Sequence, residues 1–134
     1  MKLFVFIFFA LSFFTTKSQT NSIINTNWLL VSIQDKTENK TISVVNEQSS
    51  LKIADSMIYI GACNAINFPC KIIEESKKII CTGGSIETTI NCPTRYNLIE
   101  SYYHKHTCKL NYSFTNDSLS LYDEKVTFKY VIKK

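Results

Sequence analysis

The sequence has few of the residues that divide a chain into separate units: three glycines and two prolines among 134 residues. No Pro-, Gly- or Ser-rich linker, low-complexity segment or internal repeat interrupts it. A chain of this size buries roughly two-thirds of the surface that it exposes when unfolded. The sequence therefore predicts one small domain with a modest core.

The chain also has no large excess of charge of one sign. Fifteen basic and 11 acidic side chains give a net charge of +4, and acidic residues lie among the scattered lysines. Nucleic-acid binding needs a dense group of Lys and Arg that neutralises phosphates. The two doublets present, Lys77-Lys78 and Lys133-Lys134, are more typical of a solvated turn and tail. We therefore expect no nucleic-acid partner.

Common catalytic motifs are absent as well. There is no Gly-x-Ser-x-Gly elbow, and the two histidines, His104 and His106, lie close together on one segment. The stretch Thr82 to Ser85 lacks the Lys-Ser or Lys-Thr that completes a phosphate loop. A Cys108 nucleophile with a histidine base is possible on paper, but no oxyanion site is suggested. We expect neither catalysis nor a cofactor.

The one long apolar run lies at the start of the chain, from Leu3 to Phe14. It is shorter than the roughly 20 residues that a membrane-spanning helix needs, but it fits the apolar region of a secretory signal peptide. A small, polar stretch follows, in which we predict cleavage after Ser18, with Gln19 or Thr20 as alternative ends. No cysteine follows the run, which argues against a lipoprotein anchor.

Residues 1–18 are thus expected to be a signal peptide, residues 19–26 a short extension and residues 27–134 the folded domain. No later apolar run is long enough to span a membrane, so we expect a soluble product that is secreted or held in the periplasm or cell envelope. Cleavage removes two of the fifteen basic residues and leaves thirteen against eleven acidic ones, a net charge of +2. Export would oxidise cysteines, and an odd number of them leaves at least one thiol unpaired or bonded to another chain.

Short stretches rich in Ile, Val, Tyr, Phe and Thr alternate with polar turns about every ten residues, as in an all-β barrel or sandwich. We predict strands at Trp28–Ile33, Ile42–Val45, Ser50–Ile53, Met57–Ile60, Cys70–Ile73, Lys78–Cys81, Lys109–Thr115, Leu119–Tyr122 and Val126–Ile132. One segment has helical spacing instead, and we predict a helix from Pro93 to His104 over an end or opening of the sheet. The expected fold is mainly β, a small barrel-like antiparallel sheet with one helix.

The segment from Cys70 to Cys81 resembles a hairpin centred on Glu75-Ser76, in which positions whose numbers add to 151 face each other. Cys70 and Cys81 meet this condition, so their Cβ atoms would lie about 4.5 to 5.5 Å apart. That separation suits a disulfide after slight adjustment. We predict a Cys70–Cys81 bridge. In the alternative, Cys108 bonds one of these two cysteines and leaves the other free.

A second group of candidate residues is the alternating set His104, His106 and Cys108. On an extended segment these side chains would share one face, and two imidazoles with a thiolate suit zinc or copper. In the competing interpretation, histidines at a helix end satisfy terminal carbonyl groups, and no fourth ligand is evident.

The aromatic side chains form a third group. Trp28 and the seven tyrosines could line a ligand cavity in the mouth of a barrel. Such residues more often fill the core, and we expect that role here.

Four short motifs occur in a particular order: Asn27-Trp28-Leu29-Leu30, Gly61-Ala62-Cys63-Asn64, Thr88-Thr89-Ile90-Asn91-Cys92 and Leu119-Ser120-Leu121-Tyr122. Their order and spacing resemble the META domain family, which includes the bacterial heat-shock protein HslJ. The resemblance covers Asn27 to Val131. It departs from the family at Ala62, where a second glycine is usual, and at Asn91, where alanine is common.

This resemblance implies a small β-rich, barrel-like domain of exported or envelope proteins, linked with stress tolerance, motility or virulence and without an established catalytic activity. It also implies a disulfide between Cys63 and Cys92, which occupy the family's two cysteine positions, and leaves Cys108 free. Within the matching motifs, we expect Trp28 and Asn64 to be core or ligand-facing residues.

The expected function is therefore binding without catalysis. We expect an exported monomer that contacts a protein or envelope component. The alternative is a carrier of a small apolar ligand, or of zinc or copper through His104, His106 and Cys108. A third interpretation, a secreted inhibitor of hydrolases, has only the disulfide-stapled architecture in its favour.

Overall fold

The computed structural model describes residues 22–45 and 48–134. The predicted signal peptide, residues 1–18, and the first part of the predicted extension lie outside the described residues. No helix of the described part is long and apolar enough to cross a lipid bilayer.

The described residues form ten strands and one helix. Their bounds are β1 Asn27–Asp35, β2 Lys40–Ser43, β3 Ser50–Ile53, β4 Met57–Gly61, β5 Ala65–Ile73, β6 Lys78–Cys81, β7 Ile86–Glu87, α1 Thr94–His106, β8 Lys109–Phe114, β9 Ser118–Tyr122 and β10 Val126–Ile132. In most strands buried and exposed residues alternate, because successive side chains point to opposite faces of a sheet.

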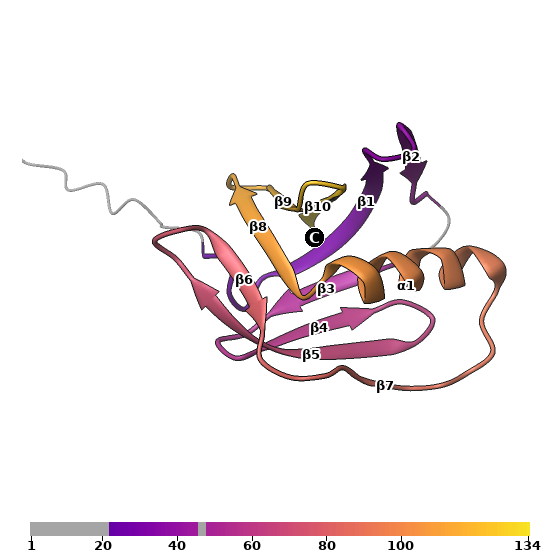
Figure 1. Ribbon diagram of the computed structural model, residues 1–134, viewed down its shortest axis with the longest axis horizontal. Helices are drawn as coiled ribbons and strands as arrows, with labels where there is room; N and C mark the ends of the chain where they lie inside the picture. The colour runs from indigo at the N-terminus through magenta and orange to yellow at the C-terminus, as the bar shows by residue number, and fades with distance from the viewer. Residues whose placement is uncertain (1–21, 46–47) are drawn as a thin grey trace, which may run out of the picture.

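Eight strands close into an antiparallel barrel in the order β1-β3-β4-β5-β6-β8-β9-β10, with β10 pairing back onto β1 (Figure 1). The two short strands lie beside this ring: β2 pairs with the end of β1, and β7 pairs with the start of β5. The predicted class, a mainly β barrel-like antiparallel sheet with one helix, is confirmed.

A bulge at Val31 allows β1 to serve two neighbours. Leu30 pairs with Tyr130 of β10, whereas Ser32 pairs with the adjacent Lys129, so Val31 is the extra residue. A bulge bends its strand and increases the local twist. The first part of β1 accordingly pairs with β3 and the last part with β2, while β10 follows it on the other side.

Strand β5 is longer than predicted, because it begins at Ala65 and not at Cys70. Pro69 caused the error. A proline has no N–H to donate, so it is rarely found in the middle of a sheet. Here Pro69 lies where β5 changes partner from β7 to β6, and its carbonyl oxygen accepts a hydrogen bond from the Thr82 N–H at 2.8 Å. The missing donor is therefore tolerated at this position.

Aromatic and branched side chains fill the interior of the barrel. Trp28 is 1% exposed, and its indole N–H donates to the carbonyl oxygen of Ile23 at 3.4 Å. Tyr103 stacks on Phe128 with ring centroids 5.1 Å apart. The other large side chains that are fully buried are Tyr130, Leu30, Ile33, Leu51, Ile53, Ile58, Ile60, Ile66 and Ile79. Trp28 is therefore a core residue, as expected.

Helix α1 begins one residue later and ends two residues later than predicted. Pro93 is the N-cap, with an extended ψ of 146°, and so precedes the first helical residue. At the other end, the backbone N–H and the hydroxyl of Thr107 both donate to the carbonyl oxygen of Tyr103. Basic residues in the last turn, His104 to His106, favour this extension because cations stabilise the carbonyl end of a helix.

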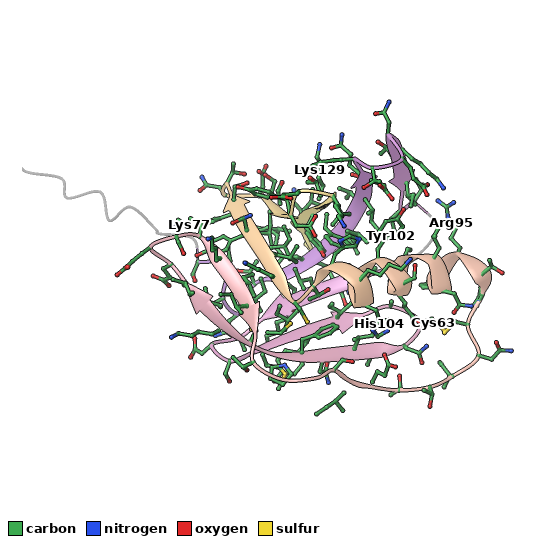
Figure 2. All side chains as sticks on the ribbon, viewed as in Figure 1. Cys63, Lys77, Arg95, Tyr102, His104 and Lys129 are labelled. Carbon is green, nitrogen blue, oxygen red and sulfur yellow. A yellow bond between two sulfur atoms is a disulfide. The ribbon has the colours of Figure 1, made fainter. Side chains whose placement is uncertain are left out.

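Helix α1 lies across one end of the barrel, between the β1–β2 side and the β4–β5–β7 side (Figure 1). Arg95 and Tyr102 point toward β2 and β1, where they donate to the Ser43 carbonyl oxygen and to an Asp35 carboxylate oxygen (Figure 2). His104 points the opposite way and pairs with Glu87 of β7. Polar contacts on both sides therefore hold the helix over the opening, as the sequence predicted.

We expect Trp28→Ala to lower the free energy of unfolding by about 3 to 5 kcal/mol, because it empties a large volume in a packed core. Urea unfolding followed by tyrosine fluorescence or circular dichroism measures this change. Val131→Ala, in the partly exposed part of β10, is the matched control and should cost less than about 1 kcal/mol. A loss below about 1 kcal/mol for Trp28→Ala would contradict the assignment of Trp28 to the core.

Candidate functional site

A connected polar group links α1 to the barrel. It consists of Asn64 in the β4–β5 turn, Thr88 after β7, Glu100 of α1 and the Cys63–Cys92 disulfide, and we call it the Asn64 latch. Two regions that are distant in the sequence, residues 63–64 and residues 88–100, meet at this point. Two of the four short motifs singled out in the sequence, at residues 61–64 and 88–92, contribute to it.

Asn64 uses its backbone and its side chain at the same time. Its backbone N–H donates to Glu100 Oε1 at 2.7 Å, and its amide nitrogen donates to Glu100 Oε2 at 3.1 Å. Its amide oxygen accepts hydrogen bonds from the Ile90 N–H at 2.9 Å and from the Thr88 hydroxyl at 3.2 Å. Both ends of the amide are therefore satisfied, as a buried polar group requires.

The Cys63–Cys92 disulfide closes the same junction covalently, with 5.9 Å between the Cα atoms. The Asn64 amide nitrogen lies 3.2 Å from Cys92 Sγ. The bridge spans 29 positions in the sequence, and a loop of that length contributes about 3 to 4 kcal/mol by restricting the unfolded chain. This is the pairing that the family resemblance implied.

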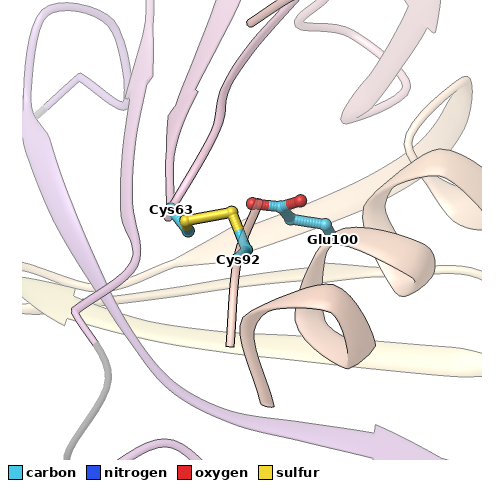
Figure 3. A group of neighbouring side chains, drawn as sticks. All are labelled: Cys63, Cys92 and Glu100. Atoms are coloured by element: carbon cyan, nitrogen blue, oxygen red, sulfur yellow. A yellow bond between two sulfur atoms is a disulfide. The ribbon is translucent and has the colours of Figure 1, made fainter. Parts of the chain in front are cut away.

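Glu100 is the functional residue that the sequence analysis missed. It is only 8% exposed, although it carries a carboxylate, and that carboxylate points toward the disulfide (Figure 3). A signal was present, because Glu100 lies on the apolar face of the helix formed by Tyr96, Ile99 and Tyr103. A carboxylate on such a face is rarely buried without a partner.

Ligand atoms of Cys63, Cys92 and Glu100 lie within 4.8 Å of one another, close enough to hold a metal ion. The two sulfurs are bonded to each other, however, and metals bind the thiolate form of cysteine. The carboxylate oxygens of Glu100 already accept from Asn64. The chemistry of the group suits a structural latch better than a metal site.

The predicted metal set of His104, His106 and Cys108 is not brought together. Both histidines belong to α1, in which residues two positions apart point about 200° away from each other. His104 Nε2 pairs with Glu87 and His106 Nδ1 with Asp123, each at 2.9 Å. Cys108 follows the helix. The prediction was wrong because it assumed an extended segment where the chain is helical.

At the end of α1, a surface cleft of about 430 Å³ lies beside His106. Its lining includes four lysines, Lys78, Lys105, Lys109 and Lys125, as well as Asp123. Burial raises the pKa of Asp123, but hydrogen bonds from His106 and from two backbone N–H groups outweigh this effect and hold that pKa below its usual value. Asp123 is therefore an ionised anchor for the end of the helix.

Tyr102 anchors the opposite side of α1. Its hydroxyl donates to Asp35 Oδ2 at 2.8 Å, and its ring stacks on that of His106 with centroids 6.1 Å apart. Burial, together with the neighbouring carboxylate, raises the pKa of Tyr102 to about 12. The phenol therefore remains protonated near neutral pH and acts as a hydrogen-bond donor to Asp35.

Three cysteines are free thiols: Cys70 is buried, Cys81 is half-buried and Cys108 is exposed. Cys70 pairs directly with Cys81 across β5 and β6, as the hairpin register predicted. The expected bridge between them is nevertheless not formed, and neither is the alternative bridge to Cys108. Burial and the neighbouring Cys108 thiol raise the pKa of Cys81 to about 12, and Cys70 packs in the core.

The tyrosines on the inner side of α1 belong to the core. The hydroxyl of Tyr103 lies 3.1 Å from the Ser49 hydroxyl and accepts from the Tyr130 hydroxyl at 3.2 Å. Burial raises the pKa of Tyr103 to about 12, so it also remains protonated. These groups satisfy one another inside the barrel. They support the core interpretation of the aromatic residues over a ligand cavity.

Two solved structures have a similar fold. An NMR structure of a protein from Burkholderia xenovorans superposes with a TM-score of 0.65 at 15% identity, covering 84% of this chain and 84% of that chain. Another NMR structure has a TM-score of 0.63 at 16% identity, covering 81% of this chain and 89% of that chain. Likeness at this level of identity shows the fold alone. No protein-family model matches the chain, and no curated protein matches it significantly.

We expect Asn64→Ala to lower the free energy of unfolding by about 2 to 3 kcal/mol, because it removes the amide that joins Thr88, Ile90 and Glu100. Chemical denaturation measures the loss. Asn67→Ala is the matched control, because it removes the same type of side chain three residues further along, within β5. The Asn67 side chain makes no hydrogen bond among the described residues. Equal losses for the two variants would contradict the role of the latch.

A second prediction concerns pH. Because the pKa of Asp123 is lowered by folding, its contribution to stability is present above the ordinary value of 3.8 and is lost as the pH falls through the folded value. Asp123→Asn should therefore cost about 1 kcal/mol at pH 6, and this difference from the wild type should shrink below about pH 4. Thermal unfolding between pH 7 and 3 tests this, with exposed Asp55→Asn as the control. A difference that is constant with pH would be contrary evidence.

Proposed function

We propose that this chain is an exported binding domain, which contacts a protein of the cell envelope or of the extracellular space and acts without catalysis. The resemblance to the META family implies roles in stress tolerance or surface interaction for such a domain. The observation that carries the proposal is that two isoleucines are exposed at fixed positions, Ile90 by the Asn64 latch and Ile86 by the pairing of β7 with β5.

Ile86 and Ile90 are 66% and 59% exposed. Ile86 is part of β7, and Ile90 is fixed at both its backbone groups, because its N–H donates to Asn64 and its carbonyl oxygen accepts from the Asn64 amide at 3.5 Å. Exposed apolar side chains that gather on one surface mark interaction sites, and rigid ones bind with a small loss of entropy. The latch therefore supports a preformed contact surface.

The same surface extends over β4 and β5. Tyr59 pairs with Asn67, and Asn67 pairs with Ile86, so the three side chains share the outer face of the sheet. Tyr59 is itself exposed. Tyrosine is enriched in protein interfaces, and here Tyr59 shares an outer face with Ile86, with Asn67 between them. We therefore infer a protein partner with a complementary apolar patch.

Two features support export. The sequence predicts a signal peptide at residues 1–18, and the Cys63–Cys92 disulfide is of a kind that persists in oxidising compartments. These features support the proposed secreted or envelope location.

The carrier alternative receives less support. The structure separates His104, His106 and Cys108, which were its metal ligands. The interior of the barrel, its candidate site for an apolar ligand, is occupied by core side chains such as Trp28, Phe128 and Tyr130. A binding function on the outer surface fits this arrangement better.

The test uses the mature chain secreted by its own cells. Fluorescently labelled protein should bind washed cells saturably and be displaced by unlabelled protein, and Ile86→Ser with Ile90→Ser should weaken displacement by about tenfold or more. Val45→Ser removes an apolar side chain that is even more exposed but lies elsewhere, and it should have no effect.

Two results would contradict the proposal. One is displacement that is equal for the wild type and the double variant, which would remove the proposed surface from the interaction. The other is a stoichiometric metal ion or apolar ligand in the native mass spectrum of the secreted protein, which would favour the carrier. The same spectrum should show a chain that begins at Gln19 if cleavage follows Ser18.

A further inference from the structure

The three free cysteines lie in one row, which runs from β5 through β6 to the residue just before β8. Cys70 of β5 is paired with Cys81 of β6. The β6–β8 register, in which Ile80 pairs with Lys109, places Cys81 opposite Cys108, and the Cys81 N–H donates to the Cys108 carbonyl oxygen at 2.9 Å. Directly opposite residues of antiparallel strands point to the same face. Cys81 is therefore the central member of the row.

Backbone pairing makes two alternative disulfides possible. Cys70 donates its N–H away from β6, to the Ser56 carbonyl oxygen, so Cys70 and Cys81 form a non-hydrogen-bonded pair with Cα atoms about 4.5 Å apart. Cys81 and Cys108 form a hydrogen-bonded pair with about 5.5 Å between Cα atoms. Both values lie within the range of about 4.4 to 6.8 Å found for disulfides.

The two outer cysteines cannot bond each other. Cys70 and Cys108 are separated by two strand spacings, about 9 to 10 Å, which exceeds the roughly 7 Å limit for a disulfide. Any bond within the row must therefore include Cys81. The bonds Cys70–Cys81 and Cys81–Cys108 exclude each other, and each leaves one outer thiol free.

Exposure increases along the row, from buried Cys70 through half-buried Cys81 to exposed Cys108. Burial raises the pKa of Cys70 to about 11 and, with the neighbouring Cys108 thiol, that of Cys81 to about 12. Only a thiolate attacks a disulfide, so the two inner cysteines react slowly from solution. A small molecule reaches Cys108 first.

We propose that Cys70, Cys81 and Cys108 form a thiol–disulfide exchange site, which accepts a low-molecular-weight disulfide at Cys108 and transfers the new bond inward along the row. This inference goes beyond the proposed binding function, because it concerns a different face and does not depend on a partner protein.

The first two steps oxidise the row. The Cys108 thiolate attacks one sulfur of the small disulfide, a mixed disulfide forms, and one small thiolate leaves and takes up a proton. The Cys81 sulfur then gives up its proton and attacks Cys108 Sγ, so that the Cys81–Cys108 bond forms and the second small thiolate leaves. Two protein thiols are oxidised, and one small disulfide is reduced to two small thiols.

The third step rearranges the bond without any oxidant. The Cys70 thiolate attacks Cys81 Sγ, the Cys70–Cys81 bond forms, and Cys108 leaves as a thiolate. Transfer from Cys108 to Cys70 is favoured because it places the uncharged disulfide at the buried position. The negative charge of the thiolate then lies on the exposed Cys108. The Cys108 thiolate can then attack a second small disulfide, which releases one small thiolate, and keep the other half as a stable mixed disulfide, since no neighbouring thiol remains to displace it.

Oxidised glutathione is a suitable probe. The full mature chain, with Cys63–Cys92 intact and the other cysteines reduced, is treated with it, quenched with acid and mapped by mass spectrometry without reduction. The wild type should end with the Cys70–Cys81 bond and one glutathione on Cys108. A wild type that forms no bond within the row would overturn the proposal.

Single variants should stop the sequence at different steps. Cys70→Ser should end at Cys81–Cys108 without a retained adduct, whereas Cys81→Ser should keep glutathione on Cys108 and form no internal bond. A Cys70–Cys108 bond in Cys81→Ser would contradict the geometry of the row.

The matched control combines Cys108→Ser with Ser76→Cys, which moves the exposed thiol to the β5–β6 turn at the other end of the hairpin. The introduced thiol should retain its glutathione, and Cys70–Cys81 should form at least about tenfold more slowly than in the wild type. An equal rate would show that Cys108 does not pass the bond inward.

One measurement on the wild type needs no variant to fold. Under brief treatment with iodoacetamide, Cys108 should be alkylated at least about tenfold faster than Cys70 and Cys81. Equal rates for the three cysteines would overturn the order of the steps.

Discussion

The structure depends on the attachment of α1 to the β4–β5 turn, which the Asn64 latch provides. A barrel with one helix across its end leaves that helix with few backbone contacts, so side chains must hold it. Asn64 and Glu100 hold it through buried hydrogen bonds, and the Cys63–Cys92 bond prevents the preceding segment from moving away. The peripheral pairs of α1, such as Tyr102 with Asp35 and His106 with Asp123, then fix its orientation. A buried, fully satisfied polar group of this kind specifies one arrangement among several that an apolar contact would permit.

The same attachment connects the core to the surface. The segment between β7 and α1 has little regular structure, yet Asn64 fixes Ile90 and the disulfide fixes Cys92. The exposed Ile90 is therefore held in place by the latch, whereas Ile86 is held by the pairing of β7 with β5. The five cysteines divide accordingly into two sets: one pair in a structural bridge, and three thiols that β5, β6 and the start of β8 bring into a row at a separate place. Oxidation forms the structural bridge in the first set, and in the second set it would form a bond that can move along the row.

Much of this fold could be predicted from the sequence, because alternation of apolar residues reports directly which face of a strand is buried. The alternation in Leu119, Ser120 and Leu121 predicted β9, and the hairpin numbering predicted the exact opposition of Cys70 and Cys81. Prediction from the local sequence failed where two patterns in the same segment indicated different structures. Pro69 led us to start β5 too late, because a residue without an N–H is not expected inside a strand. The structure tolerates it because β5 changes its neighbour from β7 to β6 at this position. At His104 to Cys108 the spacing fits both a strand and a helix end, and packing decided for the helix.

The latch could not be predicted in full, because its members come from two regions that are distant in the sequence and only the fold brings them together. Glu100 illustrates this, since its burial is explained by Asn64 and by nothing within the helix itself. Hydrogen exchange tests the central claim most directly, by comparing the intact protein with the variant Cys63→Ser plus Cys92→Ser. The account predicts that amides of α1 exchange more than about tenfold faster in the variant, while those of β8, β9 and β10 remain protected. Unchanged protection of α1, or an equal loss of protection throughout the barrel, would contradict it.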